Sequence, residues 1–137
     1  MSAHRSRGRS TPPLPFHLPA PRDSGQWTPL LDGVRMRLLH PGSRNHARVA
    51  LLRYEAGACV PWHRHSGDEH VYVLEGEQQD ERGRYAAGSY VFNPAQSGHS
   101  VQSPRGCLVL IHWLGPVVFE AAPHSSLPVD PSRNPPC

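Results

Sequence analysis

The sequence predicts an all-β protein, an antiparallel jelly roll or barrel, and three observations support this fold class. The 137 residues fit one domain, because a single sandwich or barrel core would use most of the chain. The 16 prolines and 12 glycines, with only 37% hydrophobic residues, favour short strands and turns over a helical bundle. Between the turn signals, apolar and polar residues alternate as they do in half-buried strands.

Seven stretches rich in β-branched and aromatic residues are each followed by a turn signal, and we expect them to be strands: 33–40, 47–55, 59–65, 69–79, 88–94, 99–104 and 106–115. The first ends at Pro41-Gly42, the second near Ala56-Gly57, and the third at Ser66-Gly67-Asp68. The fourth turns at Glu81-Arg82-Gly83. The fifth is followed by Pro94, the sixth closes at Pro104 and the seventh ends at Gly115. We see no convincing amphipathic helix.

Ten of the sixteen prolines lie in residues 1–25 and 121–137, so we expect a folded domain over 26–120 flanked by two flexible tails. Residues 1–22 hold four arginines and no acid, whereas the other ten arginines face eleven acids. The body is therefore near neutral and lacks the basic face of a nucleic-acid binder. The absence of lysine excludes Schiff-base chemistry on this chain. We find no secretory leader or membrane span and expect a cytoplasmic protein.

The stretch from Gly57 to Gly76 gathers histidines and a carboxylate at strand spacing. Residues two apart in a strand share a face, so His63 and His65 point the same way. After the turn at 66–68 the chain can reverse, which brings Glu69 close to the two imidazoles. His99 follows thirty residues later, and its spacing alone does not bring it near.

A resemblance to the cupin superfamily places His99. The first cupin motif, G-x5-H-x-H-x3,4-E-x6-G, is matched at every position, by Gly57, His63, His65, Glu69 and Gly76. In cupins the two motifs lie on facing strands of a small β-barrel with a divalent metal between them. The resemblance therefore implies a metal site made by His63, His65, Glu69 and His99.

The second cupin motif, G-x5-P-x-G-x2-H-x3-N, is matched in part. Gly88, Pro94 and His99 fit, whereas Gln96 stands where glycine is usual and Ser103 where asparagine is usual. The mismatches concern the turn before His99 and leave the ligand position intact.

More narrowly, residues 47–115 resemble the cupin domain of ChrR-type anti-sigma factors and small dioxygenases similar to them. That family also carries an N-terminal zinc-binding helical domain that holds the sigma factor. The first 26 residues here are proline-rich and free of cysteine, so we do not expect them to form such a domain.

Three imidazoles and one carboxylate suit a divalent transition metal, with Fe(II) or Zn(II) expected first and Mn(II), Co(II) or Ni(II) also compatible. Four protein ligands leave two places on an octahedral ion, which favours a metal-dependent oxygenase acting on a small diketone or hydroxyketone. Glu69 is the one candidate base, and no other catalytic residue is assigned. The alternative is a zinc-binding, transcription-linked sensor without catalysis, because a tetrahedral zinc would be nearly closed by the same ligands.

Other side chains receive a structural interpretation. We expect His70 to point away from Glu69, and we leave His112 open between a packed neighbour and a cavity position. Cys59 has the same parity as His63, which would turn it toward the same cavity, although inert packing is the favoured interpretation. Asp80, Glu81 and Arg82 have the pattern of a solvated hairpin tip.

Four bulky residues, Tyr72, Leu74, Tyr90 and Phe92, are expected to pack between sheets or across a contact between two copies. We therefore expect a homodimer, with a small-molecule ligand in the barrel.

Overall fold

The computed structural model describes residues 14–19 and 26–123. Within this part the chain forms strands and turns and contains no α-helix, as the sequence predicts. No helix there is long and apolar enough to cross a membrane. Most of the two expected tails, 1–25 and 121–137, lies outside the described residues.

Ten strands follow one another: β1 (Thr28–Leu31), β2 (Val34–His40), β3 (Arg48–Tyr54), β4 (Ala58–His65), β5 (Glu69–Asp80), β6 (Gly83–Ala86), β7 (Tyr90–Asn93), β8 (Gly98–Ser103), β9 (Cys107–Trp113) and β10 (Val117–Phe119). Every strand pairing is antiparallel. All seven expected strands are present, with ends that coincide or differ by at most two residues.

The expected pattern omitted β1, β6 and β10. Each has only three or four residues, too few to show alternation, and β1 contains Pro29, which normally demotes a stretch to an edge strand. Strand β1 does lie at one end of the strand order, beside β2.

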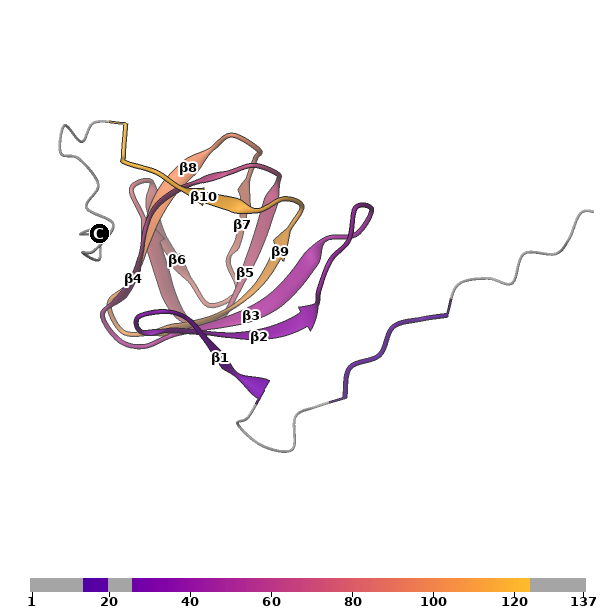
Figure 1. Cartoon of the computed structure of the whole chain (residues 1–137). Coiled ribbons are helices and arrows are strands. Elements are labelled where there is room, and N and C mark those ends of the chain that lie inside the picture. Colours follow the sequence, from indigo (N-terminus) through magenta and orange to yellow (C-terminus); the bar gives the residue numbers. More distant parts are fainter. Residues whose placement is uncertain (1–13, 20–25, 124–137) are drawn as a thin grey trace, which may run out of the picture.

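The sheet curls into a barrel because its longest strand belongs to both halves. The strand order is β1-β2-β3-β9-β5-β8-β4-β10, with β6 and β7 also paired to β5. Residues 69–76 of β5 pair with β9, whereas residues 77–80 pair with β6 and residue 79 with β8. In Figure 1 the strands surround a central space, with β3 and β9 on one side and β4 and β8 on the other.

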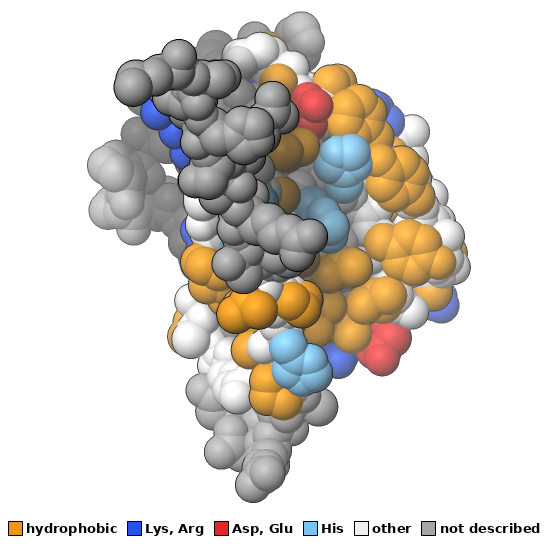
Figure 2. Space-filling view, turned by 90° about the vertical axis from the view of Figure 1, so that its right-hand side faces the viewer, with side chains coloured by type: hydrophobic (Ala, Val, Ile, Leu, Met, Phe, Trp, Pro, Cys, Tyr) orange, Lys and Arg blue, Asp and Glu red, His pale blue; other side chains and the backbone are white. Residues whose placement is uncertain are grey.

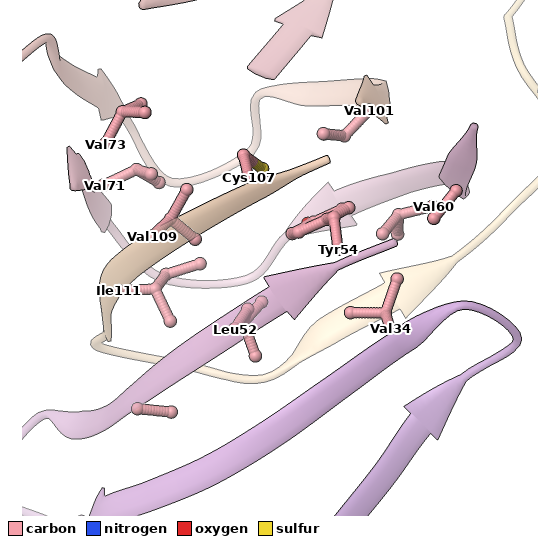
Figure 3. Close-up of a cluster of buried hydrophobic side chains, with 12 residues drawn as sticks. Val34, Leu52, Tyr54, Val60, Val71, Val73, Val101, Cys107, Val109 and Ile111 are labelled. Carbon is pink, nitrogen blue, oxygen red and sulfur yellow. The ribbon is translucent and has the colours of Figure 1, made fainter. Parts of the chain in front are cut away.

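Inward-facing residues of β3, β9 and β5 form layers down the barrel. Ala50, Ile111 and Val71 are register partners, and so are Leu52, Val109 and Val73 one layer deeper. All six are at most 5% exposed. Figure 3 shows the side chains of the five residues other than Ala50, from three separate strands, converging on one interior around Leu52 and Val109. This apolar interior lies beneath one further layer, which is polar.

Candidate metal centre

Strand β4 carries two of the candidate ligands, and a bulge decides where they point. Val60 pairs with Val101 of β8, but the next pairing joins His63 to His99, so β4 holds one more residue than β8 across this interval. Val60, His63 and His65 are buried in consequence. The bulge also breaks the parity that linked Cys59 to His63, so the less favoured alternative, in which both face one cavity, does not hold.

The turn before β8 positions His99 even though the sequence of this turn differs from the cupin motif. Gln96, which replaces the usual glycine, adopts a left-handed φ of 74°, the conformation that glycine takes most readily. Its N–H donates to the His65 carbonyl at 2.7 Å, and its side-chain oxygen accepts from Arg64 at 2.9 Å. These bonds hold the turn in its shape, so the motif mismatch does not displace His99.

The structure brings His63, His65 and His99 into one cluster that could hold a metal ion. One ligand atom from each lies within 4.8 Å of the others. The ring centroids are 4.8–5.1 Å apart, and the three residues are 5%, 1% and 4% exposed. Sequence spacing could not place His99 here. Its pairing opposite His63 across β4 and β8 does so.

Hydrogen bonds fix which nitrogen each imidazole presents. The Nδ1 atoms of His63 and His99 lie 2.8 Å from the Pro61 carbonyl and 2.9 Å from Asp80 Oδ2, so both must carry the proton there. Ser97 Oγ donates to the Pro94 carbonyl at 2.6 Å and so accepts from His65 Nδ1 at 3.1 Å. All three Nε2 atoms are therefore lone-pair donors, the form that binds a metal.

One nitrogen of the cluster, Nε2 of His65, is buried without a hydrogen-bond partner among the described residues. A buried polar atom without a partner is costly unless an unseen group satisfies it. A divalent cation coordinated by this nitrogen satisfies it, so the three imidazoles fit the metal that their chemistry implies.

Glu69, the fourth candidate, lies beside the three histidines at the start of β5. Its Oε1 is 3.3 Å from His65 Nε2 and 4.0 Å from His99 Nε2. Oε1 accepts from Asn93 Nδ2 at 2.9 Å, and Oε2 accepts from Trp113 Nε1 at 2.8 Å. These neutral donors fix the carboxylate orientation, and each oxygen keeps a further lone pair for a cation.

Those contacts belong to one row of residues across four strands. Arg48 of β3, Trp113 of β9, Glu69 of β5 and Asn93 of β7 are successive register partners. The Arg48 guanidinium carbon lies 5.8 Å from the centroid of the Trp113 ring. This row caps the apolar layers and joins the candidate metal site to the barrel rim.

The acidic tip of the hairpin formed by β5 and β6 supports His99. The Asp80 side chain is only 2% exposed, and it accepts hydrogen bonds from His99 Nδ1, from the Arg82 N–H at 2.8 Å and from Tyr85 at 3.0 Å. Arg82 also donates to Asn93 at 2.9 Å. The interpretation of a solvated tip is therefore wrong for Asp80, because the end of β5 bends toward β8, whereas Glu81 and Arg82 are exposed as expected.

Electrostatics keep these groups in metal-competent protonation states. Burial lowers the pKa of His63 to about 4 and also lowers the pKa of His99. Burial alone would raise the pKa of Asp80, but bonds from His99, Arg82 and Tyr85 lower it to about 2. Burial opposes ionisation of Glu69 as well, yet His65, His99 and Asn93 lower its pKa overall. At neutral pH the imidazoles of His63 and His99 are therefore neutral, and the carboxylates of Glu69 and Asp80 are ionised.

A chamber of about 670 Å³ opens onto the cluster. Its metal end is lined by His63, Glu69 and His99, and its walls are largely apolar. Tyr54 and Gln78 are lining residues that are buried, and burial raises the pKa of Tyr54 well above its usual range. Volume and lining are typical of a small-molecule site.

His70 and His112 lie on the other side of the sheet. They are register partners on β5 and β9, between residues whose side chains are buried inside. Nδ1 of His70 contacts the Tyr90 hydroxyl at 2.6 Å. His70 therefore points away from Glu69 as expected, and the inward residue at the end of β9 is Trp113, not His112.

The outer face of β5, β9 and β7 is largely hydrophobic (Figure 2). Its exposed members include Tyr72, Leu74, Tyr90 and Phe92, which are 41–59% exposed. The expectation that they pack between sheets is wrong for the chain alone, because they face outward.

Comparison with known proteins places the chain among related sequences. Residues 20–118 match a family model described as the ChrR cupin-like domain. The chain is 31% identical over 121 residues to the anti-sigma-E factor ChrR of Cereibacter sphaeroides, an alignment that covers 87% of this chain and 56% of that protein. The chain thus spans about half the length of this curated relative.

Solved structures share the fold. An acetylacetone dioxygenase from Acinetobacter johnsonii superposes with a TM-score of 0.68 at 20% identity, covering 80% of this chain and 82% of that one. ChrR in complex with SigE from Rhodobacter sphaeroides gives a TM-score of 0.58 at 32% identity, covering 64% and 48%. At 20% identity the likeness to the dioxygenase establishes the fold alone.

Proposed function

This chain belongs to the ChrR cupin-like domain family, and we propose that it is a metal-dependent oxygenase that acts on a small molecule held in its chamber. The observation that carries the proposal is the buried cluster of His63, His65 and His99, of which His63 and His99 line a ligand-sized chamber. A purely structural ion would need no such access. The ligands are His63, His65, His99 and Glu69.

The bound ion, Fe(II) first among the candidates, would supply Lewis-acid polarisation of substrate oxygens and a place for O₂. The chain's own residues set the geometry. The Nδ1 partners fix the three ring planes, and Asn93 and Trp113 hold the Glu69 carboxylate. The apolar chamber excludes water and orients a diketone or hydroxyketone toward the histidines.

Glu69 serves better as a ligand than as a base. Both oxygens accept hydrogen bonds, and its lowered pKa reduces its affinity for a substrate proton. A role as base would require it to leave these donors.

Metal analysis and oxygen consumption test the proposal. Protein purified without added metal is analysed for its metal content, loaded anaerobically with Fe(II), and supplied with a panel of β-diketones and hydroxyketones while oxygen uptake is followed. Stoichiometric iron with substrate-dependent uptake is expected, and uptake should be lost in His63→Ala. Full iron occupancy with no uptake across the panel would contradict catalysis.

The 31% identity to an anti-sigma factor favours a second candidate, a zinc-binding regulatory module. In this function the same residues hold zinc tightly and the chamber responds to an effector without turnover. X-ray absorption separates the two, because a closed four-coordinate zinc supports regulation and a five- or six-coordinate iron supports the oxygenase. Co-purification of a sigma factor with the tagged chain would further support regulation.

We also propose that two copies associate through the hydrophobic outer face of β5 and β7. Exposed aromatic residues gathered on one sheet face are typical of interaction surfaces. Tyr90 and Phe92 are the most exposed aromatic members of this face, at 59% and 46%. Light scattering should give a dimeric mass for the wild type and a monomeric mass for Phe92→Glu, and a monomeric wild type would contradict the proposal.

A further inference from the structure

We propose that the chamber binds an amphipathic organic anion, whose carboxylate pairs with Arg48 at the rim while its apolar body lies in the chamber beside the histidine cluster. This rests on the proposed function and narrows its ligand class. A small neutral diketone would use neither the rim nor most of the 670 Å³.

Arg48 is the first residue of β3 and faces the chamber. It alternates with the buried Ala50 and Leu52 on the inward face of the strand, and it lines the chamber. Its guanidinium carbon lies over the Trp113 ring, and its side chain makes one hydrogen bond among the described residues, a long contact of 3.8 Å to the Met36 sulfur. This cation–π contact helps to hold the guanidinium at the chamber, which Arg48 lines.

Arg48 also lacks an acidic partner within the described residues, since no carboxylate lies within 4.0 Å of it. Arg53, on the same strand but the opposite face, pairs with Glu75 at 3.4 Å. Among the described residues, therefore, the outward-facing arginine of β3 is paired with a carboxylate and the inward-facing arginine is not. An oriented, unpaired guanidinium is suited to a planar carboxylate, which it binds through two parallel hydrogen bonds.

A second guanidinium belongs to the same chamber. Arg44, in the turn between β2 and β3, is a lining residue as well. Among the lining residues the one acid is Glu69, and its oxygens are engaged by Asn93 and Trp113. Glu69 lies beside the histidines and not at the rim, so the rim itself carries the positive charge of the guanidinium groups and attracts anions.

The lining and size of the chamber indicate the polarity and length of the rest of the ligand. The walls include Met36, Leu52, Val71, Val101 and Ile111, which offer dispersion contacts and no hydrogen bonds. Arg48 and Glu69 lie on strands separated by two inter-strand spacings, about 10 Å between backbones. An anion anchored at Arg48 thus needs an apolar chain of comparable length to reach the histidines, and a medium-chain carboxylate meets both requirements.

Calorimetry with octanoate and the equally long neutral 1-octanol tests the inference, on both metal-free and Zn(II)-loaded protein. Octanoate should bind at least tenfold more tightly than octanol. Arg48→Gln should weaken octanoate about tenfold, the size expected for a lost charge-assisted interaction, and Arg48→Lys should have an intermediate effect. The control is Arg84→Gln on β6, whose side chain is 76% exposed and does not line the chamber. It removes the same net charge and should stay within about twofold.

Equal affinity for octanol and octanoate, or unchanged octanoate binding in Arg48→Gln, would overturn the inference. So would the absence of octanoate binding at millimolar concentration in protein with full metal content. The readout is independent of the oxygenase test. Arg48-dependent binding without oxygen uptake sustains the ligand class and rejects the oxygenase, whereas oxygen uptake with neutral diketones and no octanoate binding rejects the ligand class alone.

Discussion

Replacing Asp80 by asparagine should lower metal affinity without removing any ligand. The Asp80 Oδ1 atom accepts from the backbone N–H of Arg82 at 2.8 Å and from Tyr85, while Oδ2 accepts from His99 Nδ1 at 2.9 Å and from Arg82 Nη2 at 3.0 Å. The Arg82 N–H is fixed by the backbone, whereas its guanidinium is on a side chain that is 47% exposed and can turn away, so the single amide oxygen of the introduced asparagine would stay on the side of the N–H. The new NH₂ group then faces His99 Nδ1.

Two donors cannot face each other, so His99 must move its proton to Nε2, the atom that is needed for the metal. Loss of such an outer partner typically reduces metal affinity 10- to 100-fold, which corresponds to about 1.4–2.7 kcal/mol. We expect a reduction in this range for Asp80→Asn. Competition titrations with a chromophoric chelator measure it, and nitrogen NMR of the imidazoles reports the tautomer directly.

Glu81→Gln is the matched control for this substitution. Glu81 is the neighbouring carboxylate and accepts from the N–H of Ser100 at 2.8 Å, but it makes no hydrogen bond to a candidate ligand. Its replacement should leave metal affinity within about twofold. If Asp80→Asn binds metal as tightly as Glu81→Gln, the tautomer reasoning is wrong.

Three further predictions concern the ligands, a glycine and pH. His99→Ala should lose stoichiometric metal while His70→Ala retains it, by elemental analysis, and metal retention in His99→Ala would reject its assignment as a ligand. In urea unfolding, Gly76→Ala should destabilise the protein more than Gly88→Ala. Both glycines have a positive φ, but the new Cβ at position 76 would lie 2.2 Å from the Gly106 carbonyl oxygen, whereas at position 88 it would meet nothing within 4 Å. The open position should cost about 1–2 kcal/mol, and equal losses would contradict the close-approach argument. The metal-free protein should lose stability as pH falls from 6.5 to 4, because the unfolded chain takes up a proton at His63 near 6.5 and the folded chain only near 4. The loss should approach about 3 kcal/mol, and unfolding curves that match at pH 7.5 and 4.5 would refute it.

Seven of the ten described strands and the first three candidate ligands could be predicted from the sequence because strand geometry is local. His63 and His65 share a face through period-2 alternation, and Glu69 follows a short turn. His99 needed the resemblance, because its position depends on a pairing between β4 and β8 that no spacing reveals. The structure agrees with that placement.

Features that depend on irregularity or long-range register escaped prediction. Asp80 has the local sequence of an exposed turn, and its burial follows from the passage of β5 from one half of the sheet to the other. The parity argument for Cys59 failed because strict alternation does not survive a bulge. Trp113 shares the parity of the apolar run from Cys107, so alternation alone would have separated it from His112, but its bond to Glu69 requires the register of β9 on β5.

The extra residue in β4 has a practical consequence for anyone who transfers this site to another scaffold. A designer who copies the segment from Val60 to His65 onto a regular strand will find that the imidazoles and the preceding valine emerge on opposite surfaces. The transplant succeeds only when the recipient hairpin also accepts an unmatched position at Pro61 or Trp62, where proline already removes one donor from the ladder. The irregularity must therefore be copied together with the histidines.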